Sequence, residues 1–145
     1  MSVRWWLDVR DKAGTLWAIC AEFVERGEIS FEGNLSRFAL TSIPGSTTEE
    51  RGLLKRATKS PRLDFVVVPL TKQTMAHLKV ALAGANVFGW QGDLIHVQLQ
   101  SSGQLVFAAY DNFHKDCVVA QDPISVGFLQ ALAKRGLLRS YVPAA

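Results

Sequence analysis

Cysteine is scarce in this chain, and its scarcity excludes a disulfide framework. Among 145 residues there are only two cysteines, Cys20 and Cys117, whereas small secreted domains that rely on disulfides carry several pairs. A chain of this length buries enough surface to fold without such cross-links. We therefore expect one globular domain spanning 1–145, located in the cytoplasm.

Long hydrophobic runs are also missing, which argues against a membrane protein. The longest mainly apolar stretch, VALAGANVFGW (80–90), is interrupted by glycines and an asparagine. It is shorter than the roughly 20 residues that a membrane-spanning helix needs. The first residues, MSVRWWLDVRDK, mix charges with apolar residues and lack the apolar core of a signal peptide.

Motifs for cofactors and metals are absent as well. The glycines follow neither the G-x-x-x-x-G-K-[ST] nor the G-x-G-x-x-G order, and neither G-x-S-x-G nor H-E-x-x-H occurs. His114 and Cys117 have metal-ligand spacing, but a zinc site takes roughly four ligands, and the other histidines and Cys20 are scattered. The sequence predicts no cofactor and no metal site.

The chain does contain an alternation of strand and helix patterns. Helices are expected after DKAG up to Gly27, over 48–58, from Thr71 to Gly84, and from an Asp122 N-cap with Pro123 at the first helical position. Strand patterns occupy 3–10, 28–33, 35–40, 63–70, 93–100, 104–110, 116–120 and 137–142. This order predicts an α+β fold, a single domain with a mixed, mainly antiparallel β-sheet and about four packed helices.

Three of these segments carry more specific expectations. The continuous apolar run LDFVVVPL (63–70) is typical of a central strand covered on both faces. In DLIHVQLQ (93–100), Ile95, Val97 and Leu99 alternate with His96, Gln98 and Gln100, so the polar set is expected on an outer face. Glu28 and Glu32 are likewise expected on the exposed face of their strand.

Positive charge is concentrated in one segment. Residues 51–62 hold five of the sixteen basic side chains and no acidic one. Most of these residues would share one side of a helix and its C-terminal extension and attract anions, either an acidic protein surface or nucleic acid phosphates. No aromatic residue that could stack on bases lies between 46 and 64, so an acidic protein is favoured as partner. The basic residues are Arg51, Lys55, Arg56, Lys59 and Arg62.

The stretch FAAYDNFHKDCVVA (107–120) gathers polar residues between two apolar runs. One interpretation is a cysteine hydrolase with Cys117 as nucleophile, His114 as base and Asp111 as the group that orients the base. The other is a recognition loop, because aromatic residues beside polar groups are common at protein interfaces. The recognition residues would be Tyr110, Phe113, His114 and Lys115, together with Trp90 from the preceding loop.

These features favour a non-enzymatic protein-binding module over an enzyme. Bacterial immunity proteins, which neutralise a partner toxin by occluding its surface or active site, are one class of this size without cofactor motifs. The cysteine hydrolase and a nucleic-acid-binding protein that uses 51–62 are the alternatives. The expected partner is a protein with an acidic surface, such as a toxin, and no membrane is involved.

Overall fold

A computed structural model describes residues 3–84, 87–89 and 92–144. Seven strands form one sheet in the order β3-β2-β4-β5-β6-β1-β7, and every strand pair is antiparallel. The α+β class is confirmed, but the sheet is not mixed. The strands are β1 (Arg4–Val9), β2 (Gly27–Gly33), β3 (Asp64–Pro69), β4 (Leu94–Ser101), β5 (Gln104–Ala109), β6 (Val118–Gln121) and β7 (Leu138–Pro143).

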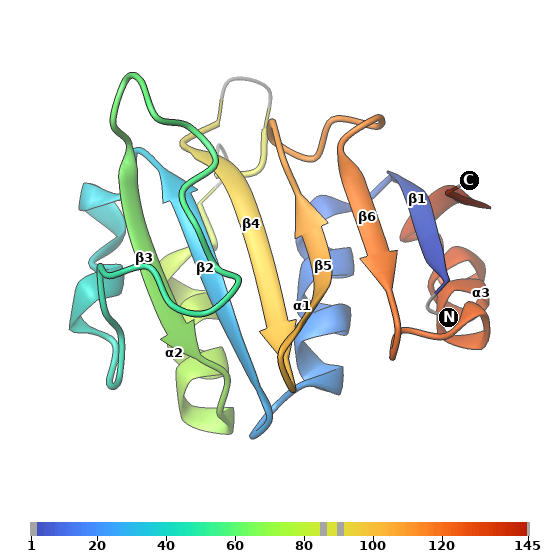
Figure 1. Cartoon of the computed structure of the whole chain (residues 1–145), viewed down its shortest axis with the longest axis horizontal. Helices are drawn as coiled ribbons and strands as arrows, with labels where there is room; N and C mark the ends of the chain where they lie inside the picture. The colour runs from blue at the N-terminus through green and yellow to red at the C-terminus, as the bar shows by residue number, and fades with distance from the viewer. Residues whose placement is uncertain (1–2, 85–86, 90–91, 145) are drawn as a thin grey trace.

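Within the described residues there are three α-helices rather than four: α1 (Lys12–Glu22), α2 (Lys72–Ala81) and α3 (Val126–Lys134). Helices α1 and α2 lie behind the sheet in Figure 1, and α3 lies beside β1 and β7. We call the side covered by these helices the helix face and the opposite side the open face. None of the described helices has the length and apolar character needed to cross a membrane.

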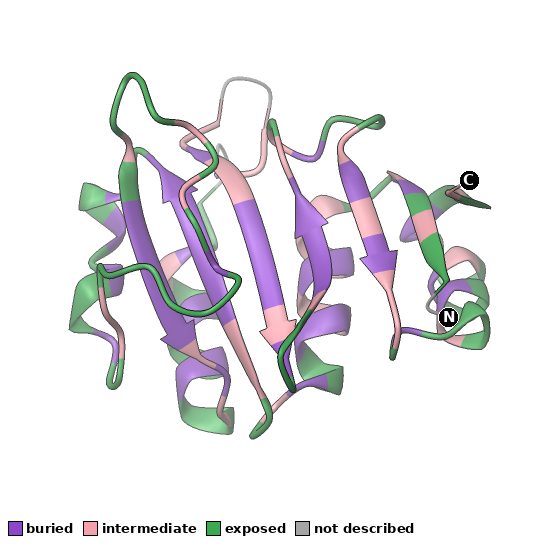
Figure 2. Ribbon diagram, in the orientation of Figure 1, coloured by how far each residue is buried: buried purple, intermediate pink, exposed green. Residues whose placement is uncertain are grey.

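The helix face holds the main core. The predicted stripe of α1, with Leu16, Ile19, Cys20 and Phe23, is fully buried there. Every second residue of the neighbouring strands belongs to the same core. These residues include Ile29 and Phe31 of β2, Val66 and Val68 of β3, and Val97 and Leu99 of β4. Figure 2 shows these strands as largely buried.

Two helix starts follow local hydrogen bonding. Asp11 caps α1, and its Oδ1 accepts from the N–H of Gly14 at 2.8 Å. Helix α3 begins after Ser125, whose Oγ accepts from the N–H of Phe128 at 3.2 Å. The predicted start at Asp122 and Pro123 is therefore wrong, because the serine three residues later supplies the cap.

Three other segments differ from expectation. Residues 35–40, predicted as a strand, form the 3-10 helices η1 (Ser36–Phe38) and η2 (Leu40–Ser42), joined at Ala39, whose φ is 54°. Strand β3 lies at the edge of the sheet, although both of its faces are covered. The predicted helix over 48–58 does not form.

In its place, residues 47–62, which we call the strap, run across the open face in front of β3, β2 and β4 (Figure 1). The capping-box spacing misled the sequence prediction because it reports only local hydrogen bonding. The strap is irregular rather than extended, because Arg51 and Leu54 exchange two backbone hydrogen bonds, at 3.1 and 2.9 Å, around a tight turn.

Candidate functional site

Side chains of β4 hold the first half of the strap. The N–H of Leu53 donates to Oε1 of Gln100 at 2.8 Å, and the N–H of Lys55 donates to Oε1 of Gln98 at 3.0 Å. The two glutamines are two residues apart on β4, and so are their donors on the strap. Gln100 therefore binds the turn at Leu53, and Gln98 binds the chain just after that turn.

Glu32 of β2 holds the second half. Its carboxylate accepts from the N–H of Ala57 at 2.7 Å and from the N–H of Thr58 at 3.2 Å. The side chain is not on an exposed face as predicted, because Glu32 is only 2 % exposed beneath the strap. A buried carboxylate is tolerated where backbone N–H groups satisfy it.

Apolar packing and one glycine complete the attachment. Leu54 is fully buried against Phe65, Val67 and Leu105, and these form a small second core on the open face. Gly52 has a φ of 58°, and a Cβ there would lie 2.7 Å from Oε1 of Gln100. The strap can approach β4 this closely because position 52 has no side chain.

The strap changes how the basic residues are arranged. They do not share one side of a helix, as predicted, because the segment is irregular and not helical. Arg51 pairs with Glu28 at 2.7 Å. The guanidinium of Arg56 lies over the Phe65 ring, 5.1 Å from its centroid, and Nη1 donates to the carbonyl oxygen of Leu63.

The other three basic side chains of the strap differ from Arg51 and Arg56 in their surroundings. Lys55, Lys59 and Arg62 are exposed. Within the described part of the chain, none of the three has a carboxylate within 4.0 Å. The strap thus presents three uncompensated cations on a backbone that the sheet holds in place.

His96 of β4 connects the strap to the loop over 110–117. Its Nδ1 accepts from the N–H of Asp111 at 3.1 Å, and its Nε2 lies 2.8 Å from Oγ1 of Thr58. Because Nδ1 is an acceptor, the neutral ring carries its proton on Nε2, which then donates to Thr58. Burial lowers the pKa of His96, and the carboxylates of Glu32 and Asp111 oppose that shift.

The loop itself contains a left-handed turn. Asp111, Asn112 and Phe113 have φ angles of 56°, 55° and 59°, which is rare for three consecutive residues other than glycine. The turn directs Phe113 into the core, where it is 5 % exposed and packs against Phe88 and Phe107. Phe113 is therefore a core residue and not the partner contact that the sequence predicted.

The other described recognition residues, Tyr110, His114 and Lys115, differ in their exposure and their contacts. Tyr110 is partly buried, and its hydroxyl accepts from Nε2 of Gln98 at 2.9 Å. His114 is exposed, and Lys115 lines a hollow with Trp6 and Val142 on the other half of the open face. Trp90 lies outside the described residues.

The surroundings of Cys117 oppose the formation of a thiolate. The Sγ atom is 4.0 Å from Nδ1 of His114, and that nitrogen also accepts from the N–H of Asp116 at 3.2 Å. Partial burial, and then the carboxylates of Asp111 and Asp116, raise the pKa of the Cys117 thiol. Reactive cysteines have a lowered pKa, so this arrangement favours the unreactive thiol.

No group of three or more His, Cys, Asp or Glu side chains suited to a metal ion occurs in the described ranges. His96 links the basic segment to the 107–120 stretch, through its contacts with Thr58 and Asp111. The candidate functional site is therefore the strap and its junction with Asp111.

Sequence reasoning missed the side chains that support the strap, namely Glu32, His96, Gln98 and Gln100. The residue types of β4 did indicate that its outer face is covered. That face carries amides and a histidine instead of the lysine or glutamate of an exposed strand. Amides with both donor and acceptor atoms suit a covered polar face. The segment that covers them could not be identified from that pattern.

Comparisons of the chain with protein-family models, with curated proteins and with solved structures find no match. Any function for the site must therefore be argued from its own residues.

Proposed function

We propose that the chain is a non-enzymatic protein-binding module that docks against an acidic surface of its partner through the strap. The observation that carries this proposal is the set of exposed cations, Lys55, Lys59 and Arg62, on a segment fixed to the sheet. Oppositely charged surfaces steer association and raise its rate.

The attachment of the strap supports binding rather than mere solvation. A flexible basic loop would lose conformational entropy on docking, whereas a segment already held by Gln98, Gln100 and Glu32 loses little. This cationic surface is suited to covering an acidic surface or active site of a partner. Neutralisation of a toxin by an immunity-type protein is the specific form of this function that we propose.

The first experiment is affinity capture of the tagged protein from its native host, with mass spectrometry and a nucleic-acid stain on the same eluate. We expect one stoichiometric protein partner. Captured nucleic acid whose binding falls steeply with salt would instead favour the nucleic-acid alternative.

The captured partner then allows a matched charge test. The double variant Lys55→Glu/Lys59→Glu should slow association at least tenfold at low salt, and less at high salt. The control Lys134→Glu/Arg135→Glu makes the same charge change at the exposed end of α3. Equal rates for the two double variants would remove the strap from the interface.

The hydrolase alternative has its own test. Cys117→Ala should leave the biological effect of the protein unchanged, because a thiol with a raised pKa is a poor nucleophile. Loss of that effect in a folded Cys117→Ala protein would reverse the assignment.

A further inference from the structure

The outer edge of β3 is only partly paired. Val67 exchanges two backbone hydrogen bonds with Thr47, at 3.0 and 2.8 Å, on the side away from β2. Residues of an antiparallel strand direct their backbone groups alternately to one neighbour and the other. The N–H and C=O of Phe65, two residues before Val67, therefore also point away from β2.

Phe65 has no partner on that side within the described residues. The carbonyl of Leu63, the next outward position, accepts from Arg56, but no segment outside the sheet bonds the backbone of Phe65. Phe65 is only 3 % exposed. Phe65 nevertheless lines an open pocket beside this edge, and unpaired backbone groups at a sheet edge are a template for pairing with another chain.

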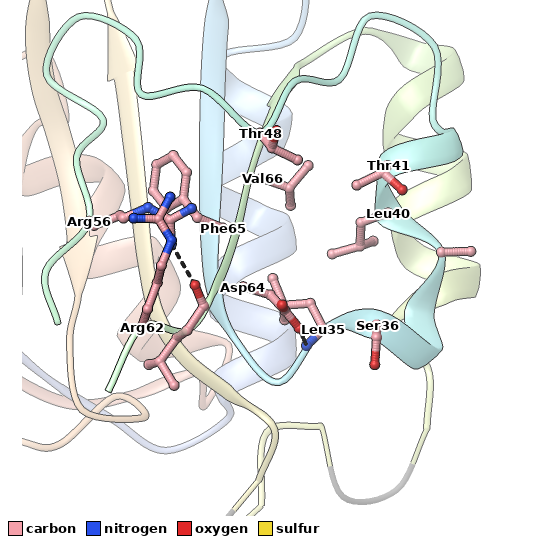
Figure 3. A pocket seen from close by; sticks show the side chains of 12 residues that line it. Leu35, Ser36, Leu40, Thr41, Thr48, Arg56, Arg62, Asp64, Phe65 and Val66 are labelled. Carbon is pink, nitrogen blue, oxygen red and sulfur yellow. Dashed lines mark hydrogen bonds between the residues drawn. The ribbon is translucent and has the colours of Figure 1, made fainter. Parts of the chain in front are cut away.

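A pocket of about 470 Å³ lies against this edge, between β3 and the segment that contains η1 and η2 (Figure 3). Leu35, Leu40 and Val66 give it an apolar wall that is continuous with the main core. Arg56 and Arg62 lie on the opposite side of it, next to Phe65. The pocket thus has an apolar wall and a cationic wall on either side of a free backbone position.

Strand geometry relates these walls to the sequence of a bound segment. A residue paired with Phe65 directs its side chain to the same face as the Phe65 ring, where the guanidinium of Arg56 lies. Its two neighbours direct their side chains to the other face, toward the apolar wall. Asp64 shares that face, and its Oδ2 accepts from the N–H of Leu35 at 2.9 Å, so acidic neighbours would be repelled there.

We propose that this pocket binds an extended segment with the pattern apolar–acidic–apolar, whose acidic residue pairs its backbone with Phe65 and its carboxylate with Arg56 and Arg62. The segment adds to the edge of β3 as a short strand, a known mode of peptide recognition. The pairing is limited to one residue, because Thr47 and Arg56 occupy the flanking positions. This inference rests on the proposed function, since the segment would belong to the acidic partner.

The test is a nuclear magnetic resonance titration of the full chain, because a short peptide is expected to bind weakly. The probe is the acetylated and amidated peptide Thr-Val-Glu-Val-Thr, and the control peptide has lysine in place of glutamate. We expect the glutamate peptide to shift the Phe65 amide resonance and to bind at least tenfold more tightly than the lysine peptide. Methylation of the glutamate backbone nitrogen should abolish the shift.

A pair of variants separates a specific site from general attraction between charges. Arg62→Glu should weaken binding of the glutamate peptide at least tenfold. Lys55→Glu makes the same charge change on the strap outside the pocket lining and should weaken it less than threefold. An unshifted Phe65 amide, equal binding of the two peptides, or equal effects of the two variants would each overturn the proposal.

These results can be told apart from a failure of the proposed function. If Lys55→Glu/Lys59→Glu slows partner association while the peptide does not bind, the strap interface stands and the pocket proposal fails. If the peptide binds at Phe65 but the strap variants leave partner association unchanged, the pocket stands and the strap interface fails.

Discussion

Over β2 and β4 the open face carries polar side chains that the strap covers, whereas over β6, β1 and β7 it carries Val119, Trp6 and Val142. On that second half Trp6 is 38 % and Val142 is 52 % exposed. On the first half Glu32 is 2 % and Gln98 is 7 % exposed. The more polar half is thus the more deeply buried, because its side chains bind a backbone instead of water.

The comparison shows why polarity alone did not indicate exposure. Over β2 and β4, the side chains of Glu32, Gln98 and Gln100 accept hydrogen bonds from N–H groups of the strap. Without the strap, these side-chain acceptors and the N–H groups of the strap would both bind water instead. We call the part of the open face over β2 and β4 the covered half and the part over β6, β1 and β7 the bare half. We expect substitutions on the covered half to lower the free energy of unfolding and matched substitutions on the bare half to change it little.

The largest effect is expected at Leu54. Leu54→Ala removes the fully buried apolar contact of the strap and should lower the free energy of unfolding by about 2–4 kcal/mol. Val142→Ala, on the bare half, should change it by about 0.5 kcal/mol or less. Urea denaturation of both variants measures the difference, and equal losses would contradict the division of the open face.

The next effect is expected at Glu32. Glu32→Ala leaves the N–H groups of Ala57 and Thr58 without their acceptor, which should cost about 1–3 kcal/mol. The control is Glu28→Ala, which removes only the surface ion pair to Arg51 and the contact to Gln100. Because such pairs contribute about 0–1 kcal/mol, thermal or urea unfolding should rank Glu32→Ala as the more damaging change.

These two positions show how far the sequence could be interpreted. The α1 stripe, the β4–β5 hairpin and the final edge strand follow from local periodicity, and the structure confirms them. The burial of Glu32 depends on residues 57 and 58, which are distant in sequence and have no apolar pattern of their own. Contacts of that kind depend on the tertiary fold, and local pattern does not report them.

The sequence predicted the charge of the candidate site but not the conformation of its backbone. The concentration of basic residues over 51–62 was visible in the sequence, and three of these side chains are exposed cations without a carboxylate within 4.0 Å in the described residues. Their irregular arrangement was missed because the capping-box spacing and Leu53, Leu54 and Ala57 favoured a helix. In the structure Leu53 lies in a tight turn and is 45 % exposed, while Leu54, at the end of that turn, is buried.

A smaller effect is expected at Gly52. Gly52→Ala combines a φ of 58° with a Cβ too close to Gln100, and should cost about 1–2 kcal/mol. Gly103→Ala is the matched control, because its φ is 75° but nothing lies within 4 Å of the added Cβ. A larger loss for Gly52→Ala, measured by urea unfolding, would show that the strap lies close to β4.

The smallest effect is expected from the protonation of His96. Its lowered pKa in the folded protein means that the unfolded chain takes up the proton first as the pH falls. The contribution of His96 is therefore fully present above its unfolded pKa of about 6.5 and is lost as the pH falls toward the lower folded value. Over that range His96→Gln should reduce the slope of unfolding free energy against pH, and an unchanged slope would contradict the role of His96 as a neutral link between Thr58 and Asp111.

Amide hydrogen exchange of the strap tests the central claim most directly, because that claim is a cationic segment held in place by the sheet. The N–H groups of Leu53, Lys55, Ala57 and Thr58 each donate to a side chain of β2 or β4. They should exchange at least a hundredfold more slowly than the same amides in an unfolded peptide, and Glu32→Ala should release Ala57 and Thr58 more than Leu53. Exchange of all four amides at the unfolded rate in the native protein would contradict the account.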